Sequence, residues 1–182
     1  MIKVFTGPMY ASKSYGLINT YLKLINEEKD NIVCFKPSKD TRDKAKIKSR
    51  VIKTTLDAIV IKDFSEIKWH INEKTKVILI DEAQFISGDT QELLWLTIYN
   101  KIDIYIAGLN LTSELTPFNS MPNILSIATE VVNLYADCED CGKDAEYTYC
   151  LVNKKDEILV GSDEYIPLCR DCLYKRLKSK EK

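Results

Sequence analysis

The sequence predicts an α/β fold: a mainly parallel sheet with helices on both faces, followed by a small unit that contains most of the cysteines. Segments typical of strands and of helices alternate along residues 1–136, and this alternation favours parallel strands joined by helical connections. After Ala136 the segments become short and rich in cysteine and charge. We therefore expect two units, residues 1–136 and residues 137–182.

Short runs of aliphatic and β-branched residues mark the expected strands of the first unit. They are residues 2–6, 31–35, 58–61, 77–80, 103–109 and 130–135. Helices are expected where the apolar residues recur near helical period, at residues 13–27, 64–72 and 90–100. Residues 39–53 are polar and basic with few large apolar side chains, so we expect a surface loop there that becomes ordered only when ligand binds.

Charge and hydropathy argue against some classes of partner. The chain carries 26 Lys and Arg against 27 Asp and Glu, for a net charge of −1, which argues against a large basic surface for nucleic acid. Its apolar runs extend for only a few residues, whereas a membrane span needs about 20. A strand-like segment from residue 2 leaves no room for a signal peptide. We therefore expect a cytoplasmic protein with no nucleic-acid or membrane partner.

Residues 7–14 nearly match the phosphate-binding loop G-x-x-x-x-G-K-[ST], between an expected strand and an expected helix. In such a loop Gly7 would form the tight turn, Lys13 would contact the β- and γ-phosphates, and Ser14 would bind Mg²⁺. Ser12 replaces the second glycine; if that position requires a positive φ, the side chain costs about 1–2 kcal/mol. An ordinary turn between strand and helix is the alternative.

Two adjacent acidic residues favour a nucleotide site. Asp81 and Glu82 end the aliphatic strand at 77–80, at the edge where such sheets bind ligands. Asp81 would hold Mg²⁺ through water, as in phosphate-loop NTPases, and Glu82 would act as a general base. A pair of acidic residues in a surface turn is the alternative. Together with the lysine-containing loop, this pair favours the fold of a phosphate-loop NTPase.

Four of the six cysteines form two C-x-x-C pairs, Cys138 with Cys141 and Cys169 with Cys172. In a chain without an export signal, this spacing favours a metal site over disulfides. Four thiolates complete the tetrahedral coordination of Zn²⁺ and leave no open position, so we expect a structural zinc site. An iron–sulfur cluster or a set of redox cysteines is the alternative.

Several motifs, in order along the chain, resemble those of the small zinc-containing type of the thymidine kinase family. Residues 7–14 resemble its G-P-M-F-S-G-K-[ST] loop, and residues 36–42 resemble its K-x-x-x-D-T-R segment. Residues 81–85 resemble D-E-[AG]-Q-F, and residues 106–110 resemble the A-G-L-D that follows. With the two cysteine pairs, the resemblance covers nearly the whole chain.

This resemblance implies an ATP-dependent thymidine kinase, which transfers the γ-phosphate of ATP to the 5′-hydroxyl of thymidine or a related pyrimidine deoxynucleoside in nucleotide salvage. It also implies Mg²⁺ with the ATP, a structural Zn²⁺, a small-molecule nucleoside as partner and, by analogy alone, a homotetramer. A phosphate-loop ATPase or a nucleic-acid-remodelling module is one alternative, although the sequence shows neither a sensor or finger element nor a basic channel. A weakened or non-catalytic relative that binds nucleotide or a modified pyrimidine nucleoside is another.

The resemblance also assigns roles to individual residues. Glu82 would accept the proton of the 5′-hydroxyl, and Arg42 would steady the transferring phosphoryl group. The residues that would bind ATP and Mg²⁺ are Gly7, Met9, Ser12, Lys13, Ser14, Asp40 and Asp81. The residues that would bind the nucleoside are Phe85, Leu109, Phe118, Ile158, Leu159, Val160, Gly161 and Tyr165. Residues 158–165 match a loop of the family, called the lasso, beneath which the base lies.

Four residues depart from the pattern of the family. Ser12 replaces a glycine, and Asn110 replaces the aspartate after A-G-L. Ser113 stands where the family has a phenylalanine beside the base, and Val160 replaces a glycine of the lasso. These changes concern substrate binding more than the phosphate chemistry, so the preferred pyrimidine base is left open.

Overall fold

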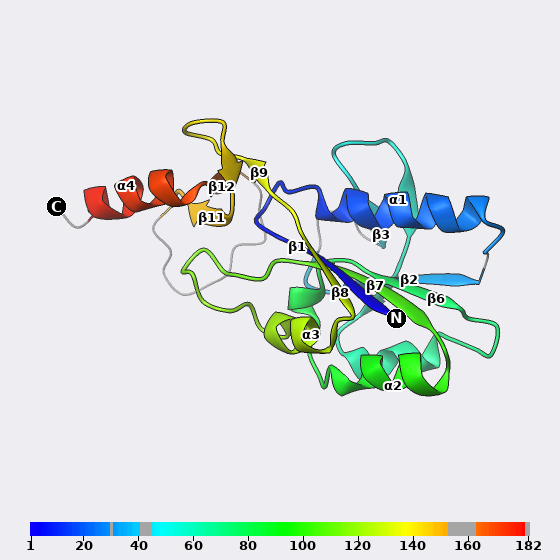
Figure 1. Ribbon diagram of the computed structural model, residues 1–182. Helices are drawn as coiled ribbons and strands as arrows, with labels where there is room; N and C mark the ends of the chain where they lie inside the picture. The colour runs from blue at the N-terminus through cyan, green and yellow to red at the C-terminus, as the bar shows by residue number, and fades with distance from the viewer. Residues whose placement is uncertain (30, 41–44, 153–162, 181–182) are drawn as a thin grey trace.

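The computed structural model describes residues 1–29, 31–40, 45–152 and 163–180 (Figure 1). Its centre is a six-stranded sheet with the strand order β5-β2-β6-β7-β1-β8, in which every pair of neighbours is parallel. These strands are β1 (Ile2–Thr6), β2 (Ile32–Pro37), β5 (Ile59–Ile61), β6 (Val77–Ile80), β7 (Asp103–Gly108) and β8 (Glu130–Asn133). The predicted parallel sheet is confirmed.

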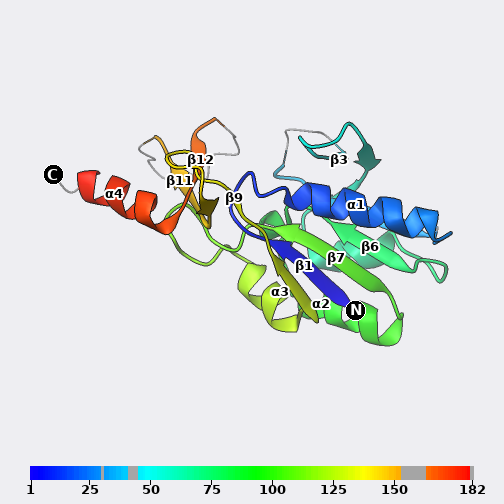
Figure 2. The ribbon, with the colours of Figure 1, turned by 45° about the horizontal axis from the view of Figure 1, so that its top comes forward.

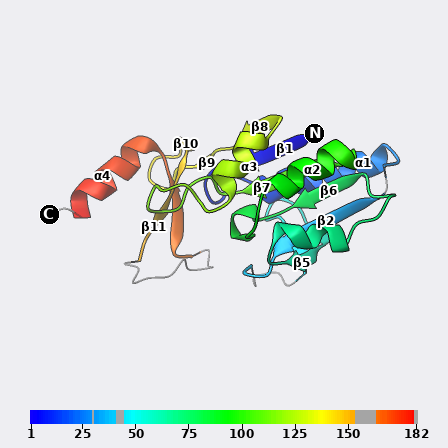
Figure 3. The same ribbon diagram turned by 90° about the horizontal axis from the view of Figure 1, so that it is seen from below.

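Helices cover both faces of this sheet, as Figures 1 and 3 show from two directions. Helix α1 (Lys13–Asn26) lies on one face. Helices α2 (Gln91–Tyr99) and α3 (Met121–Ile127) lie on the other, together with the 3₁₀ helix η1 (Phe64–Trp69). The predicted coverage of both faces is therefore also confirmed.

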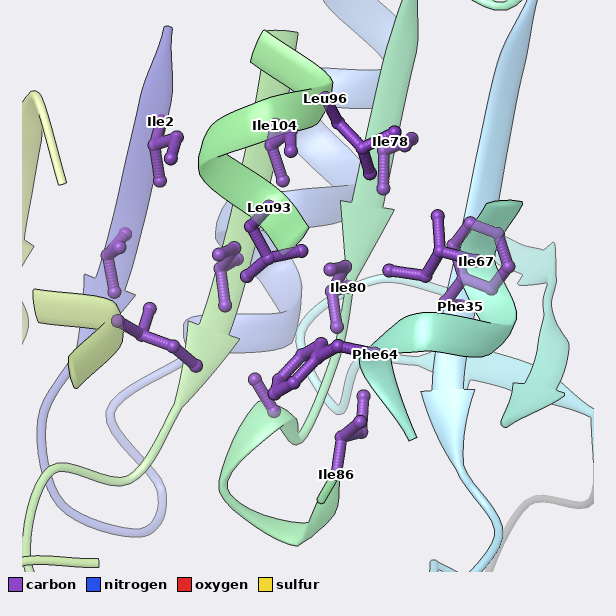
Figure 4. Close-up of a cluster of buried hydrophobic side chains, with 14 of the residues drawn as sticks. Ile2, Phe35, Phe64, Ile67, Ile78, Ile80, Ile86, Leu93, Leu96 and Ile104 are labelled. Atoms are coloured by element: carbon purple, nitrogen blue, oxygen red, sulfur yellow. The ribbon is translucent and has the colours of Figure 1, made fainter. Parts of the chain in front are cut away.

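Strand β6 shows how alternating side chains build the two layers. Ile78 and Ile80 point into the core beneath α2, with Phe64 and Leu93 (Figure 4). Leu79, from the same strand, points into the second core beneath α1. Because both faces are covered, all four residues of the strand are buried, which explains its uninterrupted aliphatic sequence.

The parallel pairing brings the carboxyl ends of four strands to one edge of the sheet. Strands β1 and β7 end at the paired residues Thr6 and Gly108. Strand β6 ends at Ile80, which pairs with Phe35 near the end of β2. The segments that follow these strands therefore begin side by side, and they carry most of the residues that the sequence assigned to nucleotide and nucleoside binding.

Residues 45–53 differ from the surface loop that the sequence predicts over residues 39–53. Strands β3 (Lys46–Lys48) and β4 (Thr55–Asp57) form an antiparallel hairpin beside α1 (Figure 2). Ile47 and Leu56 are buried in the core that lies beneath α1. The prediction was wrong here because each strand buries one apolar residue between two exposed neighbours, and a pattern of three residues is too short to recognise.

Helix α3 is a second element that the sequence analysis did not predict. It begins at Met121 and has Pro122 in its first turn, a position where proline favours the start of a helix. Met121 and Ile124 are buried against the sheet. The proline was therefore the signal that would have identified this helix.

The C-terminal residues form a small unit of two antiparallel strand pairs and one helix. Its elements are β9 (Ala136–Asp137), β10 (Asp144–Ala145), β11 (Tyr147–Cys150), β12 (Tyr165–Leu168) and α4 (Arg170–Lys180). A third buried cluster includes Tyr149 and Leu168 of this unit, and Ala11 of the phosphate loop joins it. Helix α4 extends away from the sheet (Figure 2). Among the helices of the described residues, none has the length and apolar character needed to cross a membrane.

We predict that Ile47→Ala lowers the free energy of unfolding by about 2–4 kcal/mol, because truncation of a fully buried isoleucine leaves a cavity beneath α1. Val51→Ala is the matched control, since Val51 lies between the two strands of the same hairpin and is 58% exposed. This substitution should change the free energy of unfolding by no more than about 0.5 kcal/mol. Urea unfolding of the two variants measures both values. Equal effects would show that the hairpin does not contribute to the core.

Candidate nucleotide and nucleoside site

The phosphate loop joins β1 to α1 through residues with positive φ. Gly7 has a φ of 141°, and a Cβ atom there would lie 2.1 Å from the carbonyl oxygen of Leu134, so a side chain does not fit. Ser12, directly before α1, has a φ of 58° and a ψ of 29°, in the left-handed region. Position 12 therefore does require the conformation that glycine adopts freely, and the serine carries a cost of about 1–2 kcal/mol.

Lys13 and Ser14 are the first residues of α1. The ammonium group of Lys13 donates a hydrogen bond to the carbonyl oxygen of Pro8, within the phosphate loop. The hydroxyl of Ser14 donates to the carboxylate of Asp81, with 3.1 and 3.0 Å from Oγ to Oδ1 and Oδ2. The structure thus brings together the hydroxyl and the carboxylate that the sequence assigned to Mg²⁺.

Asp81 follows β6 and is 6% exposed. Burial, and after it the negative charge of Glu82, raises the pKa of Asp81 to about 7, against the lowering effect of the hydrogen bond from Ser14. The charge of Asp40 also raises this pKa. A divalent cation would offset the repulsion among these carboxylates. The set of one hydroxyl and several carboxylate oxygens fits Mg²⁺, which prefers oxygen ligands.

Asp40 follows β2 and is held by a buried ion pair. Its Oδ2 lies 3.1 Å from Nζ of Lys36, and the two side chains are only 5% and 2% exposed. Lys36 also donates a hydrogen bond of 3.2 Å to the carbonyl oxygen of Lys46 in β3. One ammonium group therefore fixes Asp40 and ties the hairpin to the central sheet.

Glu82, the predicted general base, occupies a strained turn. It has a φ of 51° and leads into the 3₁₀ helix η2 (Ala83–Phe85). Positive φ at a residue other than glycine or asparagine is strained, and such strain is concentrated at functional sites. The Oε2 atom of Glu82 accepts a hydrogen bond of 2.6 Å from Nε2 of Gln84. Gln84 is fully buried, and the sequence analysis gave it no role.

Two aromatic residues assigned to the nucleoside pocket are in contact. The rings of Phe85 and Phe118 pack edge to face, with centroids 5.4 Å apart and an interplanar angle of 82°. Phe85 comes from η2 and Phe118 from the segment after β7. Leu109, also assigned to this pocket, begins that segment, and its N–H donates to Oε1 of Gln84 at 3.0 Å. These residues therefore form one group beside Glu82.

Other assigned residues cannot be placed in this group. Tyr165 is buried at the start of β12, where it pairs with Cys150 of β11. Five assigned residues lie outside the described part of the chain: Arg42, Ile158, Leu159, Val160 and Gly161.

Thr148 is a contact of the phosphate loop that the sequence analysis missed. Its hydroxyl accepts a hydrogen bond of 2.9 Å from the backbone N–H of Met9, and its side chain is buried. Met9 was expected to bind ATP, and its N–H links the phosphate loop to β11. A small polar residue between two tyrosines of a strand was the available signal, but the sequence does not show what such a residue faces.

The four cysteines of the C-x-x-C pairs gather in the C-terminal unit. Their sulfur atoms all lie within 4.8 Å of one another, and all six cysteines of the chain, each within the described residues, are free thiols. The Sγ atoms of Cys141 and Cys169 are 3.7 Å apart, close to the edge of about 3.8 Å expected for a tetrahedron with Zn–S bonds of about 2.3 Å. The arrangement fits a closed structural zinc site.

The pKa values of two thiols in this cluster are shifted in opposite directions. A hydrogen bond with Cys141, followed by burial, raises the pKa of Cys172 to about 12. Burial also raises the pKa of Cys138, but backbone N–H groups that donate to its sulfur outweigh this effect and lower the pKa to about 6. The pKa of one thiol is therefore lowered while that of its neighbour is raised, and a bound cation would favour the ionised form of both.

The fold and the site together define a class of protein. A parallel sheet, a lysine-containing phosphate loop and an acidic pair after a central strand are features of a phosphate-loop nucleotide-binding enzyme. The four-cysteine cluster adds to this fold a small unit whose thiols fit a zinc site. The chain belongs to the thymidine kinase family, because the family model described as thymidine kinase matches residues 1–173.

Comparison with individual proteins gives the same family. A protein named thymidine kinase from Pseudothermotoga lettingae is 29% identical over 181 residues, which cover 98% of this chain and 97% of the relative. One from Mycoplasma mobile is 36% identical over 174 residues, with 94% and 86% covered. One from Onion yellows phytoplasma is 34% identical over 179 residues, with 93% and 84% covered. The resemblance seen in the motifs is therefore confirmed.

We predict that Ser12→Gly raises the free energy of unfolding by about 0.5–1 kcal/mol. Glycine removes the strain of the left-handed conformation, but it also loses more backbone entropy on folding, which offsets part of this gain. Ser12→Ala is the matched control. It keeps the Cβ atom, and the serine hydroxyl makes no capping hydrogen bond that could be lost, so the alanine variant should gain nothing. Urea unfolding compares the two, and equal stability of the variants would refute the strain at this position.

We also predict one tightly bound Zn²⁺ per chain and its loss in Cys141→Ser, because serine is a poor zinc ligand and the remaining thiols leave the tetrahedron open. Metal analysis of purified protein measures the content, and thermal unfolding should occur at a lower temperature in the variant. Cys150→Ser is the control, since Cys150 lies outside the cluster and its variant should retain the metal. Equal zinc content in both variants would exclude the four-cysteine site.

Proposed function

We propose that this protein is an ATP-dependent thymidine kinase that transfers the γ-phosphate of ATP to the 5′-hydroxyl of thymidine. Membership of the thymidine kinase family over residues 1–173 supports the reaction and the substrate. The observation that carries the proposal is the hydrogen bond between Ser14 and Asp81 beside Glu82, because it joins at one edge of the sheet the groups that phosphoryl transfer needs.

In this proposal the phosphate loop binds the triphosphate of ATP. Lys13, the backbone N–H groups of the loop and the N-terminus of α1 would neutralise its charge. Ser14 and Asp81 would hold Mg²⁺, with Asp40 near them. The cation would reduce the negative charge of the phosphate oxygens, as it does in other phosphate-loop enzymes.

Glu82 would accept the proton of the 5′-hydroxyl during transfer. A general base acts within hydrogen-bond distance of the proton that it removes, so the proposal places the 5′-hydroxyl beside the carboxylate of Glu82. Arg42 would steady the transferring phosphoryl group. Phosphoryl transfer depends on alignment and charge neutralisation more than on covalent chemistry, and one aligned carboxylate is therefore sufficient.

The nucleoside would bind against the edge-to-face pair of Phe85 and Phe118, with Leu109 beside them. Phe118 is buried and Phe85 is half-buried, so Phe85 would present the apolar surface suited to a pyrimidine ring and the methyl group of thymine. Residues 158–161 and Tyr165 would cover the base and sugar from the other side. Ser113 offers no ring to this pocket, so a larger substituent on the pyrimidine would also be accommodated.

The chain would act as two units, an ATP-binding unit of residues 1–136 and a zinc-binding lasso unit of residues 137–182 that closes over the nucleoside. The cysteine pairs flank the lasso in the sequence, so bound Zn²⁺ would anchor both ends of this loop. By analogy with the family we propose a homotetramer. We place it in the cytoplasm, where the four thiolates remain reduced.

The proposal predicts transfer of label from γ-labelled ATP to thymidine in the presence of Mg²⁺, and a loss of at least about 100-fold in Glu82→Gln, because the amide cannot accept the proton. Deoxyuridine and deoxycytidine, assayed in parallel, report which base the pocket accepts. Chromatography of the labelled nucleotide measures each rate.

Glu73→Gln is the matched control, since Glu73 is an exposed carboxylate before β6 and its variant should keep full activity. Both proteins should unfold at the same urea concentration as the wild type. Undiminished transfer by folded Glu82→Gln would exclude Glu82 as the base. No transfer to any of the three nucleosides by the zinc-loaded wild type would overturn the proposed function.

A further inference from the structure

Gln84 is a fully buried amide two residues after Glu82, and both ends of the amide are used. Its Nε2 donates to Oε2 of Glu82 at 2.6 Å, and its Oε1 accepts from the backbone N–H of Leu109 at 3.0 Å. A glutamine with 0% exposure needs such partners. This side chain therefore joins the proposed base to the first residue of the segment that follows β7.

The orientation of this amide is fixed by the chemistry of its two partners. The backbone N–H of Leu109 only donates, and an ionised carboxylate only accepts. A flip of the Gln84 amide would oppose N–H to N–H at Leu109 and oxygen to oxygen at Glu82. The N–H of Gln84 is therefore committed to Glu82, in a hydrogen bond strengthened by the charge of the carboxylate.

The main chain around Gln84 is held by the same segment. Nδ2 of Asn119 donates to the carbonyl oxygen of Gln84 at 2.9 Å, and the hydroxyl of Ser120 donates to that of Ala83 at 3.1 Å. A Cβ atom at Gly108 would lie 2.9 Å from Oε1 of Gln84, so the absence of a side chain there makes room for the amide. Gln84 has little freedom to move away from Glu82.

We infer that Gln84 is a positioning residue, which orients the carboxylate of Glu82 for proton acceptance and ties that orientation to the segment starting at Leu109. This inference rests on the proposed function. Glu82 is half-buried and sits in a turn, and a carboxylate on a flexible side chain loses rate when it samples other rotamers. Misplacement by a fraction of an ångström to an ångström costs up to about 100-fold in rate.

The first test uses Gln84→Met in the full-length, zinc-loaded protein. Methionine keeps the length of the side chain and removes the donor, so kcat should fall by about 10- to 100-fold while KM for thymidine changes by less than about threefold. Gln91→Met is the matched control. It makes the same change at an exposed glutamine in the first turn of α2, so its kcat should stay within about threefold of the wild type.

A double-mutant cycle distinguishes positioning from a structural role. If Gln84 acts through Glu82, Gln84→Met should lower kcat by less than about threefold when Glu82 is already glutamine. A structural role predicts the same loss in both backgrounds and a matching loss of stability in urea. Additive losses, or full kcat in folded Gln84→Met while Glu82→Gln is inactive, would overturn the inference and leave the proposed function intact.

Gln84→Leu serves if the methionine variant does not fold, because leucine also removes the donor and places no second carboxyl group beside Glu82. Its kcat should fall at least as far as expected for methionine. Full activity of folded Gln84→Leu would equally overturn the inference. Absence of kinase activity in the wild type would instead refute the proposed function itself.

Discussion

The parallel register of the central sheet is the constraint on which the site depends. Residues that end β1, β2, β6 and β7 lie on neighbouring strands at one edge, so each following segment starts a few ångströms from the next. Ser14 and Asp81 are 67 residues apart in the chain and share a hydrogen bond for this reason. Short side chains are therefore sufficient to bring these groups into contact, because the strand pairing already places their backbone positions close together.

This arrangement concentrates negative charge and strain at the same edge. Asp40, Asp81 and Glu82 are close enough for their charges to interact. The fold balances them with groups that are themselves buried: Lys36 pairs with Asp40, and the amide of Gln84 donates to Glu82. The positive φ of Glu82 adds backbone strain. This conformation persists because the packing of the surrounding residues holds the turn in place. Lys36 and Gln84 thus stabilise the acidic residues at this edge of the sheet, and a bound cation would offset the remaining negative charge.

Features that repeat along the chain could be predicted from the sequence, and features that depend on single contacts could not. The aliphatic run of β6, buried on both faces, and the apolar period of α1 were long enough to recognise. The hairpin around Ile47 depends on one buried residue per strand, and the roles of Gln84 and Thr148 depend on partners 25 and 139 residues away. Motif spacing predicted the reacting groups, whereas the contacts that hold their side chains became evident only from the packing.

Contacts of the phosphate loop connect the C-terminal unit to the proposed ATP site. Ala11 is buried in the small core of that unit, and the N–H of Met9 is paired with Thr148 of β11. On its other side the loop is continuous with α1, so neither end is free to adjust alone. The conformation that places Lys13 and Ser14 therefore depends on the fold of the cysteine-containing unit. Zinc bound there would stabilise the phosphate loop, because Ala11 of that loop lies in the same small core as Cys138, Cys169 and Cys172.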